Sequence, residues 1–501
     1  MRDYEVLVIG AGASGLGAAI RLTQAGVESL AVLEKADGLG GTWRDNTYPG
    51  CACDVPSALY SYSFAPNPEW SRAFAGQAEI REYLRDTAER FGVAGRIRFG
   101  VEVTRAQWTG ARWELETSDG RYTARILVAG TGPWHEPRIP DLPGLDAFPG
   151  EVFHSARWNH GYDLAGKRVA VIGTGASAVQ FVPEIAPEVA RLHLFQRTAQ
   201  WVLPKPDHAV PGLERLVVRQ FPALRRALRS AEYGLMEALG YGFRHPWLLR
   251  QVQRIGLAHL RLTVRDPALR RALTPDYTLG CKRLLMSNTY YRALTRSTVD
   301  VHPTAVRAVE GARVIGADGS SAEVDAIIFG TGFHILDMPV SARVFDADGR
   351  SLDDHWQGSP QAYRGTSVAG FPNLYLLLGP SLGTGHTSAF MIMEAQLRHV
   401  VAAVLRTGPG TLEVRREAQD RFNAEVQAAL PGTVYQSGGC SSYYTDVNGR
   451  NSFSWPFSTG RLRGEVGAFA ESDYLVSEEE PADARCAGKY QTVPAFLVSH
   501  P

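Results

Sequence analysis

Two stretches of the chain share one glycine pattern: residues 6–17 read VLVIGAGASGLG, and residues 169–180 read VAVIGTGASAVQ. Each begins with an apolar run typical of a buried parallel strand and continues into an alanine-containing segment that predicts a helix. The order of strand, glycine turn and helix is typical of the unit that binds a dinucleotide. The sequence therefore predicts an α/β fold with two Rossmann-like domains.

The first unit has glycine at each position where the chemistry requires it. Gly10 permits the tight turn, Gly12 lets a pyrophosphate approach the backbone, and Gly15 lets the helix pack on the strand. The next apolar strand, SLAVLEK, ends in Glu34, about twenty residues further on, where a carboxylate accepts hydrogen bonds from an adenosine ribose. A glycine turn without a ligand is the alternative, and the strands, helix and acid together favour dinucleotide binding.

The second unit differs from the first at the residue that meets the ribose. Gly173, Gly175 and Ala178 form the G-x-G-x-x-A variant, and Arg197 stands at the offset where the first unit has its acid. A carboxylate would repel a 2′-phosphate, whereas a guanidinium can bind it with two hydrogen bonds, and Thr198 adds a hydroxyl. We therefore expect NADP(H) in the second unit and an unphosphorylated adenosine, that of a tightly held flavin, in the first. A solvated surface role is the alternative for Arg197.

The bulk composition narrows the class of partner. The chain has 501 residues, enough for two or three domains, and 45% hydrophobic and 21% charged residues are typical of a globular protein. The 52 Lys and Arg residues equal the 52 Asp and Glu residues, so no net positive charge attracts a nucleic acid. We expect a small molecule, and no nucleic acid, as the partner.

The cysteines and the apolar segments bear on the compartment. The five cysteines, at positions 51, 53, 281, 440 and 486, show neither a metal-ligand spacing nor a disulfide framework, as is typical of a reducing compartment. The first apolar run is short and broken by glycines, unlike a signal peptide, and no segment is long and apolar enough to span a bilayer. The sequence predicts a cytoplasmic protein with no metal and no integral membrane segment.

Two further strands fit a flavoprotein in which the chain leaves one nucleotide domain and later returns to it. The segments ILVAGTG (126–132) and AIIFGTG (326–332) each end in Thr-Gly. Disulfide reductases also have two dinucleotide sites, but they carry a cysteine pair beside the flavin. Cys51 and Cys53 are too close in sequence to form a comfortable disulfide, which disfavours that class.

The segment between the two glycine loops names a family. Residues 148–160 read FPGEVFHSARWNH, and Phe148, Gly150, His154 and Trp158 match F-x-G-x-x-x-H-x-x-x-W. This pattern resembles the fingerprint of type I Baeyer-Villiger monooxygenases; the related flavin-containing monooxygenases usually lack the tryptophan. Three further segments resemble the same family: GGTWRDNTYPGCACDVPSALYSYSF (40–64), LGCKRLLMSNTYYRAL (279–294) and NGRNSFSWP (448–456).

The resemblance implies an FAD monooxygenase that uses NADPH and O₂ and inserts one oxygen atom next to a ketone carbonyl through a C4a-peroxyflavin. Arg283 matches the cation that stabilises the anionic intermediates, and Asp54 matches the acid that positions this arginine and contacts the nicotinamide. Lys282 matches a second ligand of the 2′-phosphate. A turn-capping role for Asp54 and a surface ion pair for Arg283 are the alternatives.

Other functions remain open at this point. An enzyme of the same superfamily that oxygenates nitrogen or sulfur is the main alternative, and a flavin-containing sensor that never oxygenates is a further one. His154 and Trp158 are assigned, with Phe148 and Gly150, to a hinge between domains, because the fingerprint histidine is thought to act through domain motion. The remaining cofactor contacts implied by the matched segments are Ser14, Thr42, Trp43, Val55, Tyr60, Val103 and Ser177.

Two residues are predicted to lie at the substrate. His386 lies in the glycine-containing loop LGPSLGTGHTS (378–388), which the resemblance places near the flavin ring. Trp455, together with Phe457, is predicted to belong to a mobile loop that closes the pocket. Ordinary core packing is the alternative for these aromatic residues.

Between the two parts of the second unit, strand signals vanish and Leu, Ala and Arg dominate, which predicts a helical insert. We expect its arginines to lie on solvated helix faces that cover the substrate cleft, with an interfacial membrane helix as the alternative. A monomer and a homodimer remain equally open. The predicted domains are 1–140 and 331–465 for FAD, 141–205 and 279–330 for NADP, 206–278 for the helical insert and 466–501 for a C-terminal tail.

Overall fold

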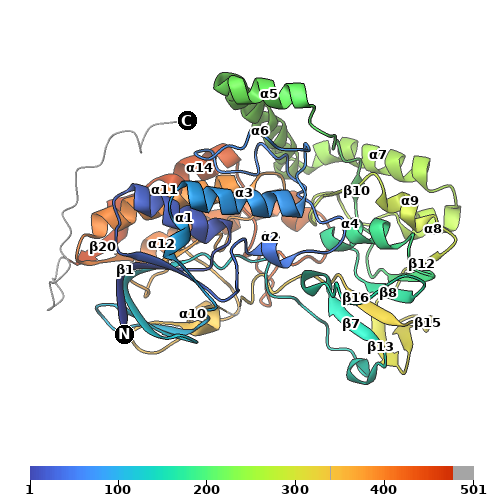
Figure 1. Ribbon diagram of the computed structural model, residues 1–501, viewed down its shortest axis with the longest axis horizontal. Helices are drawn as coiled ribbons and strands as arrows, with labels where there is room; N and C mark the ends of the chain where they lie inside the picture. Colours follow the sequence, from blue (N-terminus) through green and yellow to red (C-terminus); the bar gives the residue numbers. More distant parts are fainter. Residues whose placement is uncertain (339, 478–501) are drawn as a thin grey trace.

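The computed structural model describes residues 1–338 and 340–477, which fold around two separate β-sheets (Figure 1). In these residues the first sheet has eight strands in the order β17-β4-β5-β6-β1-β2-β3, with β18 paired to β6. Its strands are β1 (Arg2–Ile9), β2 (Leu30–Glu34), β3 (Ile97–Phe99), β4 (Val103–Trp108), β5 (Trp113–Thr117), β6 (Gly120–Ala129), β17 (Val344–Phe345) and β18 (Leu374–Leu376). β1 runs parallel to both β2 and β6, so the apolar run before the first glycine loop forms the centre of the sheet.

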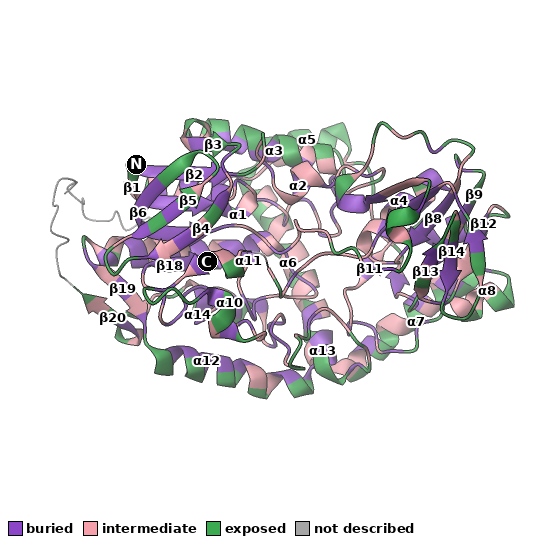
Figure 2. Ribbon diagram, turned by 90° about the horizontal axis from the view of Figure 1, so that it is seen from below, coloured by how far each residue is buried: buried purple, intermediate pink, exposed green. Residues whose placement is uncertain are grey.

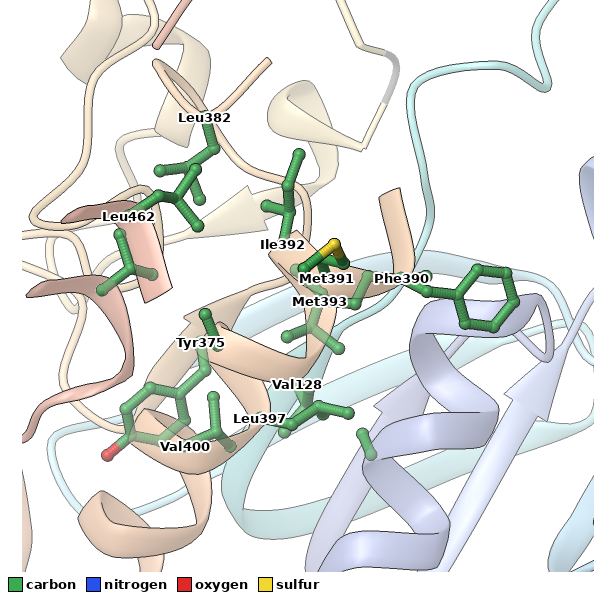
Figure 3. Packing of buried hydrophobic residues seen from close by; sticks show 14 of the residues in the cluster. Val128, Tyr375, Leu382, Phe390, Met391, Ile392, Met393, Leu397, Val400 and Leu462 are labelled. Carbon is green, nitrogen blue, oxygen red and sulfur yellow. The ribbon is translucent and has the colours of Figure 1, made fainter. Parts of the chain in front are cut away.

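Three helices pack beside this sheet: α1 (Ala13–Gln24), α3 (Gln77–Arg90) and α11 (Ala389–Thr407) (Figure 1). Figure 3 shows the centre of the packing, where Met393 and Leu397 of α11 belong to the same buried cluster as Val128 of β6. The apolar stretch after residue 388 is therefore a core helix. Among the described residues, no helix is long and apolar enough to cross a membrane.

The second sheet is wholly parallel in the described residues and has the order β12-β9-β8-β16-β7. Its strands are β7 (Glu151–His154), β8 (Arg168–Ile172), β9 (Arg191–Phe195), β12 (Val299–His302) and β16 (Ala326–Phe329). Helices α4 (Ala176–Ile185) and α9 (Tyr290–Leu294) share its buried cluster, and the antiparallel strands β13 (Val306–Glu310), β14 (Arg313–Gly316) and β15 (Ser321–Glu323) form a small sheet beside it. The predicted α/β class with two Rossmann-like units is confirmed.

Both glycine loops use the same close approach of two backbones. Gly10 has a φ of +95° and Gly173 a φ of +108°, values that side chains rarely permit. A Cβ atom on Gly10 would lie 2.8 Å from the carbonyl oxygen of Gly130, and one on Gly173 would lie 2.4 Å from that of Gly330. Each first loop glycine is thus required by the Thr-Gly strand end that packs against it.

The two linkers between the sheets are hydrogen-bonded to each other. The outgoing linker follows β6 and the returning linker follows β16, and Pro137 of the first forms an antiparallel bridge with Phe333 of the second. The amide of Arg138 donates to the oxygen of Gly332 at 2.9 Å, and the amide of His334 donates to the oxygen of Glu136 at 3.0 Å. The chain therefore crosses between the sheets as a two-stranded ribbon.

The segment predicted as a helical insert contains α5 (Gly212–Gln220), α6 (Pro222–Arg244), α7 (Pro246–Thr263) and α8 (Pro267–Ala272). Proline opens α6, α7 and α8, where its missing N–H costs no helical hydrogen bond. In the sequence these helices lie between β10 (Val202–Leu203) and β11 (Leu285–Met286), two short strands that pair with each other in parallel. In Figure 1, α5, α6 and α7 occupy the upper edge of the molecule.

The C-terminal part completes the first domain. It contains α12 (Arg416–Ala429), α13 (Val434–Ser437), α14 (Thr459–Gly467) and the antiparallel pair β19 (Thr411–Val414) and β20 (Tyr474–Ser477). In Figure 2 the strands of the two large sheets are mainly buried, whereas α12 alternates between buried and exposed residues. Tyr474 is 2% exposed. The packed structure thus extends beyond residue 465, where the sequence places the end of the domain, and residues 478–501 of the predicted tail lie outside the described part.

One expectation about the cysteines is wrong. Cys281 and Cys440 form a disulfide, although they are 159 residues apart. The sequence hides this pair because only the fold brings the segment before β11 next to the loop after α13. Cys51 and Cys53 are free thiols, and Cys486 lies outside the described residues.

A buried histidine makes the stability of this domain dependent on pH. His399 of α11 is fully buried, its Nε2 lies 2.7 Å from the hydroxyl of Tyr474 and its Nδ1 lies 2.8 Å from the oxygen of Ala468. Burial lowers the pKa of His399 to about 4, whereas an unfolded histidine titrates near about 6.5. The neutral His399 therefore makes its full contribution to the stability of the folded protein above the pKa of the unfolded state. This contribution is lost as the pH falls toward the pKa of the folded state.

We expect wild-type protein to lose about 2–3 kcal/mol more of its free energy of unfolding between pH 7 and pH 4.5 than His399→Gln does. The measurement is urea unfolding of the holoenzyme at both pH values. The exposed His208→Gln is the matched control and should follow the wild type. Parallel curves for His399→Gln and wild type would show that this ring titrates alike in both states.

Candidate active site

One cavity of about 1110 Å³ is lined by both glycine loops and by the segments that follow them. Most of the predicted cofactor residues line it: Gly10, Gly12, Ser14, Glu34, Thr42, Trp43, Asp54, Val55, Tyr60, Val103, Gly173, Gly175, Ser177, Arg197, Thr198 and Lys282. Arg283 and His386 line it too. The structure thus brings together residues that span more than three hundred positions of the chain, and their individual roles remain predictions.

Gly15 and Ala178 are not in the cavity wall, and their contacts explain why. A Cβ atom on Gly15 would lie 1.9 Å from the carbonyl oxygen of Gly10, so this glycine permits the helix to pack on the loop. Ala178 is fully buried, and a Cβ atom on Gly330 would lie 3.3 Å from its methyl group. The third position of each pattern therefore contacts protein rather than the cavity, as the close packing of helix and strand requires.

The first half of the cavity has the features that an adenine dinucleotide requires. Gly12 caps α1 and lies against a second glycine turn, because a Cβ atom on Gly41 would lie 2.9 Å from the Cα of Gly12. The carboxylate of Glu34, 8% exposed, accepts hydrogen bonds from the amides of Ala11 at 2.7 Å and Ala36 at 2.9 Å. An open helix N-terminus beside a fixed carboxylate fits the pyrophosphate and ribose of FAD.

The second half has two cations where the first has its acid. Burial lowers the pKa of Lys282, and the charge of Arg197 lowers it further, so the two side chains lie close enough to repel each other. The ammonium of Lys282 also lies 5.0 Å from the ring centroid of Tyr277. Asp276 offsets part of this repulsion, and a dianionic 2′-phosphate between the two cations would remove the rest.

Arg283 and Asp54 form a paired charge at the junction of the two halves. Nε of Arg283 donates to Oδ2 of Asp54 at 2.9 Å and Nη2 donates to Oδ1 at 2.6 Å. The charge of Asp54 raises the pKa of Arg283; burial opposes ionisation of Asp54, but Arg283 outweighs it and holds the pKa of Asp54 below its usual value. The 38% of the Arg283 side chain that is exposed faces the cavity, which it lines.

Further residues around this pair escaped the sequence analysis. The guanidinium of Arg283 lies 5.9 Å from the ring centroid of Trp134, which in turn contacts Tyr443 and Phe453 edge to face. Lys205 donates to the oxygen of Cys53 at 3.0 Å and adds a second positive charge near the acid. Trp134 and Tyr443 belong to no motif that the analysis used, and Phe453 lies in the matched segment 448–456 without having been singled out; only the fold brings the three rings to the charged pair.

The fingerprint residues lie outside the cavity wall, in and around β7, which pairs with the strand β16 that leads to the returning linker. His154 ends β7, opposite Phe329 of β16, and its ring is 2% exposed. Its Nδ1 accepts a hydrogen bond from the amide of Ala156, and burial lowers its pKa to about 4. Trp158 packs edge to face on Phe153, at 5.1 Å between ring centroids. These contacts suit the predicted hinge role better than proton transfer, which requires a group that titrates near neutral pH.

Phe148 and Gly150 also serve packing. Phe148 is 8% exposed and belongs to the buried cluster beneath the small antiparallel sheet. A Cβ atom on Gly150 would lie 2.2 Å from the oxygen of Asp325, so only glycine fits there. The fingerprint therefore fixes β7 against β16, at the end of which the chain turns back toward the first sheet.

The prediction for Trp455 requires correction. Its side chain is 1% exposed, lies between Phe422 and Phe457, and is absent from the cavity wall. Its Nε1 donates to the oxygen of Ser458 at 3.1 Å. Trp455 is a core residue of the C-terminal segment, and Phe453, two positions earlier, points to the cavity instead.

His386, by contrast, lies in the cavity wall, and its place at the substrate stays a prediction. Its ring lines the cavity and its Nε2 lies 3.0 Å from the hydroxyl of Thr459 and 3.6 Å from the carboxylate of Glu237. Burial opposes ionisation of Glu237, but the nearby His386 and the hydrogen bond that the amide of Thr459 donates outweigh this effect and lower the pKa of Glu237 to about 2. These contacts connect α6, the glycine loop and α14 at one end of the cavity.

The disulfide joins two walls of the cavity. Cys281 directly precedes Lys282 and Arg283, and Cys440 directly precedes the lining residues Ser441 to Tyr443. The bond therefore limits how far the arginine segment and the aromatic loop can separate. The bond also closes a loop across a sequence separation of 159 residues and so lowers the conformational entropy of the unfolded chain.

Replacing both cysteines by serine is expected to lower the free energy of unfolding by about 3–5 kcal/mol, because the open loop gains chain entropy. The Michaelis constant for the substrate should also rise, since the two walls are no longer held together. Thermal unfolding and steady-state kinetics of Cys281→Ser/Cys440→Ser measure both effects, and Cys53→Ser tests for a general effect of losing a buried sulfur. An unchanged melting temperature in the double variant would contradict the stabilising role.

Two nucleotide units that face one cavity, with an arginine at their junction, define a pyridine-nucleotide-dependent flavoprotein oxidoreductase. In agreement, residues 7–215 match the family model described as pyridine nucleotide-disulphide oxidoreductase. Within the described part of the chain, Cys51 and Cys53 are free thiols rather than the bonded pair of a disulfide reductase. The class is therefore settled at the level of the two cofactors.

Sequence relatives give the family. A "Baeyer-Villiger monooxygenase" of Streptomyces coelicolor is 49% identical over 486 residues, which cover 95% of this chain and 93% of the relative. The chain therefore belongs to the Baeyer-Villiger monooxygenase family.

Solved structures agree with this assignment. An oxidised steroid monooxygenase bound to NADP matches with a TM-score of 0.83 and 29% identity, over 96% of this chain and all of that chain. A complex of OTEMO with FAD and NADP matches with a TM-score of 0.83 and 26% identity, over 95% of this chain and 99% of that chain. Both neighbours share the fold along nearly its whole length.

Proposed function

We propose that this protein inserts one atom of molecular oxygen next to the carbonyl carbon of a ketone, with FAD and NADPH as cofactors, and releases an ester or lactone. It is an NADPH-dependent FAD monooxygenase of the Baeyer-Villiger type. The observation that carries the assignment of residues is the bidentate pair of Arg283 and Asp54 in the wall of the cavity that both nucleotide loops share.

The glycine loops and their partners bind and orient the two cofactors. Gly10, Gly12 and Glu34 hold FAD, while Gly173 and Arg197 hold NADPH with Lys282. FAD held there would supply the redox and oxygen chemistry that no amino-acid side chain provides, with NADPH as its reductant. The protein contributes the positions of both cofactors and the charge at the point where they meet.

Arg283 supplies that charge. Arginine stays protonated even when buried, so it can stabilise the negative charge that develops on the carbonyl oxygen of the ketone. Its Nε and Nη2 bind Asp54, Tyr443 is a further neighbour of the guanidinium, and an N–H group that faces the cavity would donate to the reacting oxygen. Asp54 orients the guanidinium and compensates its charge in the free enzyme, and Lys205 in turn offsets the charge of Asp54.

The remaining walls suit an apolar ketone. Met236 and Leu239 of α6, Leu382, Phe453 and Trp134 bring apolar side chains to the cavity. Such walls exclude water, which strengthens the interaction of Arg283 with a developing anion. We assign the reaction to the cytoplasm.

The test uses purified holoenzyme, NADPH and isotopically labelled dioxygen with a panel of cyclic, linear and aromatic ketones, thioethers and amines. The expected result is an ester or lactone that carries one labelled oxygen atom and forms in proportion to the NADPH consumed. Labelled sulfoxide or N-oxide without any ester would favour the nitrogen- or sulfur-oxygenating alternative. NADPH oxidation that gives hydrogen peroxide with every compound would contradict the monooxygenase assignment.

A further inference from the structure

The exposed apolar side chains of this protein are concentrated on three helices. Of fifteen large hydrophobic residues that are exposed in the described part of the chain, ten lie between residues 212 and 263, a segment of α5, α6 and α7 that we name the helical layer. They are Leu213, Leu216, Phe221, Leu224, Leu228, Leu235, Tyr241, Trp247, Ile255 and Leu262. Such a concentration of exposed apolar side chains in one segment points to a site of interaction.

The same helical layer carries a strong excess of positive charge. It contains nine arginines and three glutamates, with no lysine or aspartate, in a chain whose net charge is zero. Within it, α7 has three arginines and no acid. The rest of the chain is correspondingly acidic, so the positive charge is a local feature of this surface rather than a general property.

Helix α7 shows how the two features are arranged. Its buried side is formed by Leu249, Gly256 and Leu260, as expected for a helix that packs on a domain. At 100° per residue, the exposed apolar residues Trp247, Ile255 and Leu262 fall on the opposite side of the helix. This second apolar line has no partner among the described residues.

Arginines border this second line. Arg250, Arg254 and Arg261 are all exposed and fall along one edge of it. A helix with an aromatic and aliphatic line bordered by arginines is typical of one that lies in the interface of a bilayer, where the apolar line enters the acyl boundary and the guanidinium groups stay with the phosphates.

Helix α6 connects this surface to the active site. Phe221, Leu224, Leu228 and Leu235 recur at spacings of three, four and seven along its exposed side, whereas Met236 and Leu239 line the cavity. The same helix therefore carries an exposed apolar line along its first turns and contributes to the wall of the cavity nearer its C-terminal end. An apolar molecule held in a membrane would lie next to the helix that borders the proposed substrate space.

We propose that the helical layer docks on the surface of an anionic lipid bilayer and thereby places the cavity next to membrane-dissolved substrates. Charge complementarity selects this occupant over a second copy of the chain: two helical layers packed face to face would bring their arginine excesses together, whereas anionic headgroups neutralise them. Binding of the helical layer to a bilayer goes beyond the proposed function, and it can be measured without any oxygenation activity of the enzyme.

The test is flotation of the holoenzyme with vesicles of phosphatidylglycerol and phosphatidylcholine, compared with vesicles of phosphatidylcholine alone, at low and high salt. The expected result is binding to the anionic vesicles that weakens as salt rises. Ile255→Glu/Leu262→Glu and Arg250→Gln/Arg254→Gln should each lower the partition coefficient by about tenfold or more. The matched control, Arg307→Gln/Arg313→Gln, removes two exposed arginines from the small antiparallel sheet and should bind as the wild type does.

Each other outcome overturns the proposal. If wild-type protein does not float with the anionic vesicles at low salt, the proposal is wrong. If all variants bind as strongly as the wild type, the membrane contact lies elsewhere on the protein. Sedimentation velocity tests the second copy: a wild-type dimer that Leu228→Glu dissociates, with no vesicle binding, would assign the helical layer to self-association. Oxygenation of a water-soluble ketone by every variant, measured in parallel, separates loss of binding from loss of folding and from any failure of the proposed function.

Discussion

Arg283→Ala is expected to lower the rate of ketone oxygenation by about 100- to 1,000-fold, while NADPH continues to reduce the flavin at a similar rate. The variant removes the cation that would stabilise charge on the carbonyl oxygen, and this charge develops only after the flavin has been reduced. The measurement pairs anaerobic reduction by NADPH, followed by flavin absorbance, with quantification of the ester product. Consumption of NADPH and oxygen should then yield hydrogen peroxide in place of ester.

Two companion variants sharpen this result. Arg283→Lys keeps a positive charge but loses the two parallel hydrogen bonds to Asp54, so it should recover only part of the activity. Arg98→Ala removes an exposed arginine from β3 and controls for general loss of stability. Unchanged ketone oxygenation by Arg283→Ala would contradict the catalytic assignment, and retained oxygenation of thioethers alone would indicate that the arginine serves only the attack on a carbonyl.

The double variant Arg197→Gln/Lys282→Gln is expected to raise the Michaelis constant for NADPH by about 100-fold or more while leaving that for NADH nearly unchanged. Each charged hydrogen bond to phosphate contributes about 1.5–3 kcal/mol, and only NADPH carries the 2′-phosphate. Steady-state kinetics with both coenzymes measure the effect, and the FAD content of the purified protein should stay the same, because these side chains belong to the second glycine loop.

The matched control for this pair is Arg296→Gln, an exposed arginine of the same domain. An equal loss of affinity for NADPH and NADH would show that the two cations orient the whole nucleotide rather than its phosphate. The single variants Arg197→Gln and Lys282→Gln compare the two residues: the one whose loss lowers the NADPH preference more makes the larger contact.

The sequence predicts the two nucleotide units well because their determinants are local. Gly10 and Gly173 each belong to a strand, turn and helix that follow one another directly, and Glu34 and Arg197 stand at a fixed distance from them. The positions of Lys282, Arg283 and Asp54 in the cavity wall agree with the motifs that suggested them. Their pairing across 229 residues could be inferred only through the family resemblance.

The failures share a different origin. The Cys281–Cys440 bond and the contact of Trp134 with Tyr443 join segments that no local pattern relates. Trp455 and Phe453 stand two positions apart in a segment without regular structure, so neither period nor composition indicates which ring faces the core. In such segments the direction of a side chain depends on tertiary contacts, as with the Trp455 hydrogen bond to Ser458.

The paired linkers between the two sheets constrain how the nucleotide domains can move. A single extended strand can bend and twist in every direction. The bridge of Pro137 and Phe333 and the flanking hydrogen bonds instead form a two-stranded ribbon, which bends easily only out of its own plane. Rotation of the NADP domain should therefore resemble the swing of a door about one axis. The second glycine loop would then move along a single arc relative to the first sheet, so that holding the coenzyme close to the first sheet and admitting a ketone become two positions on the same path.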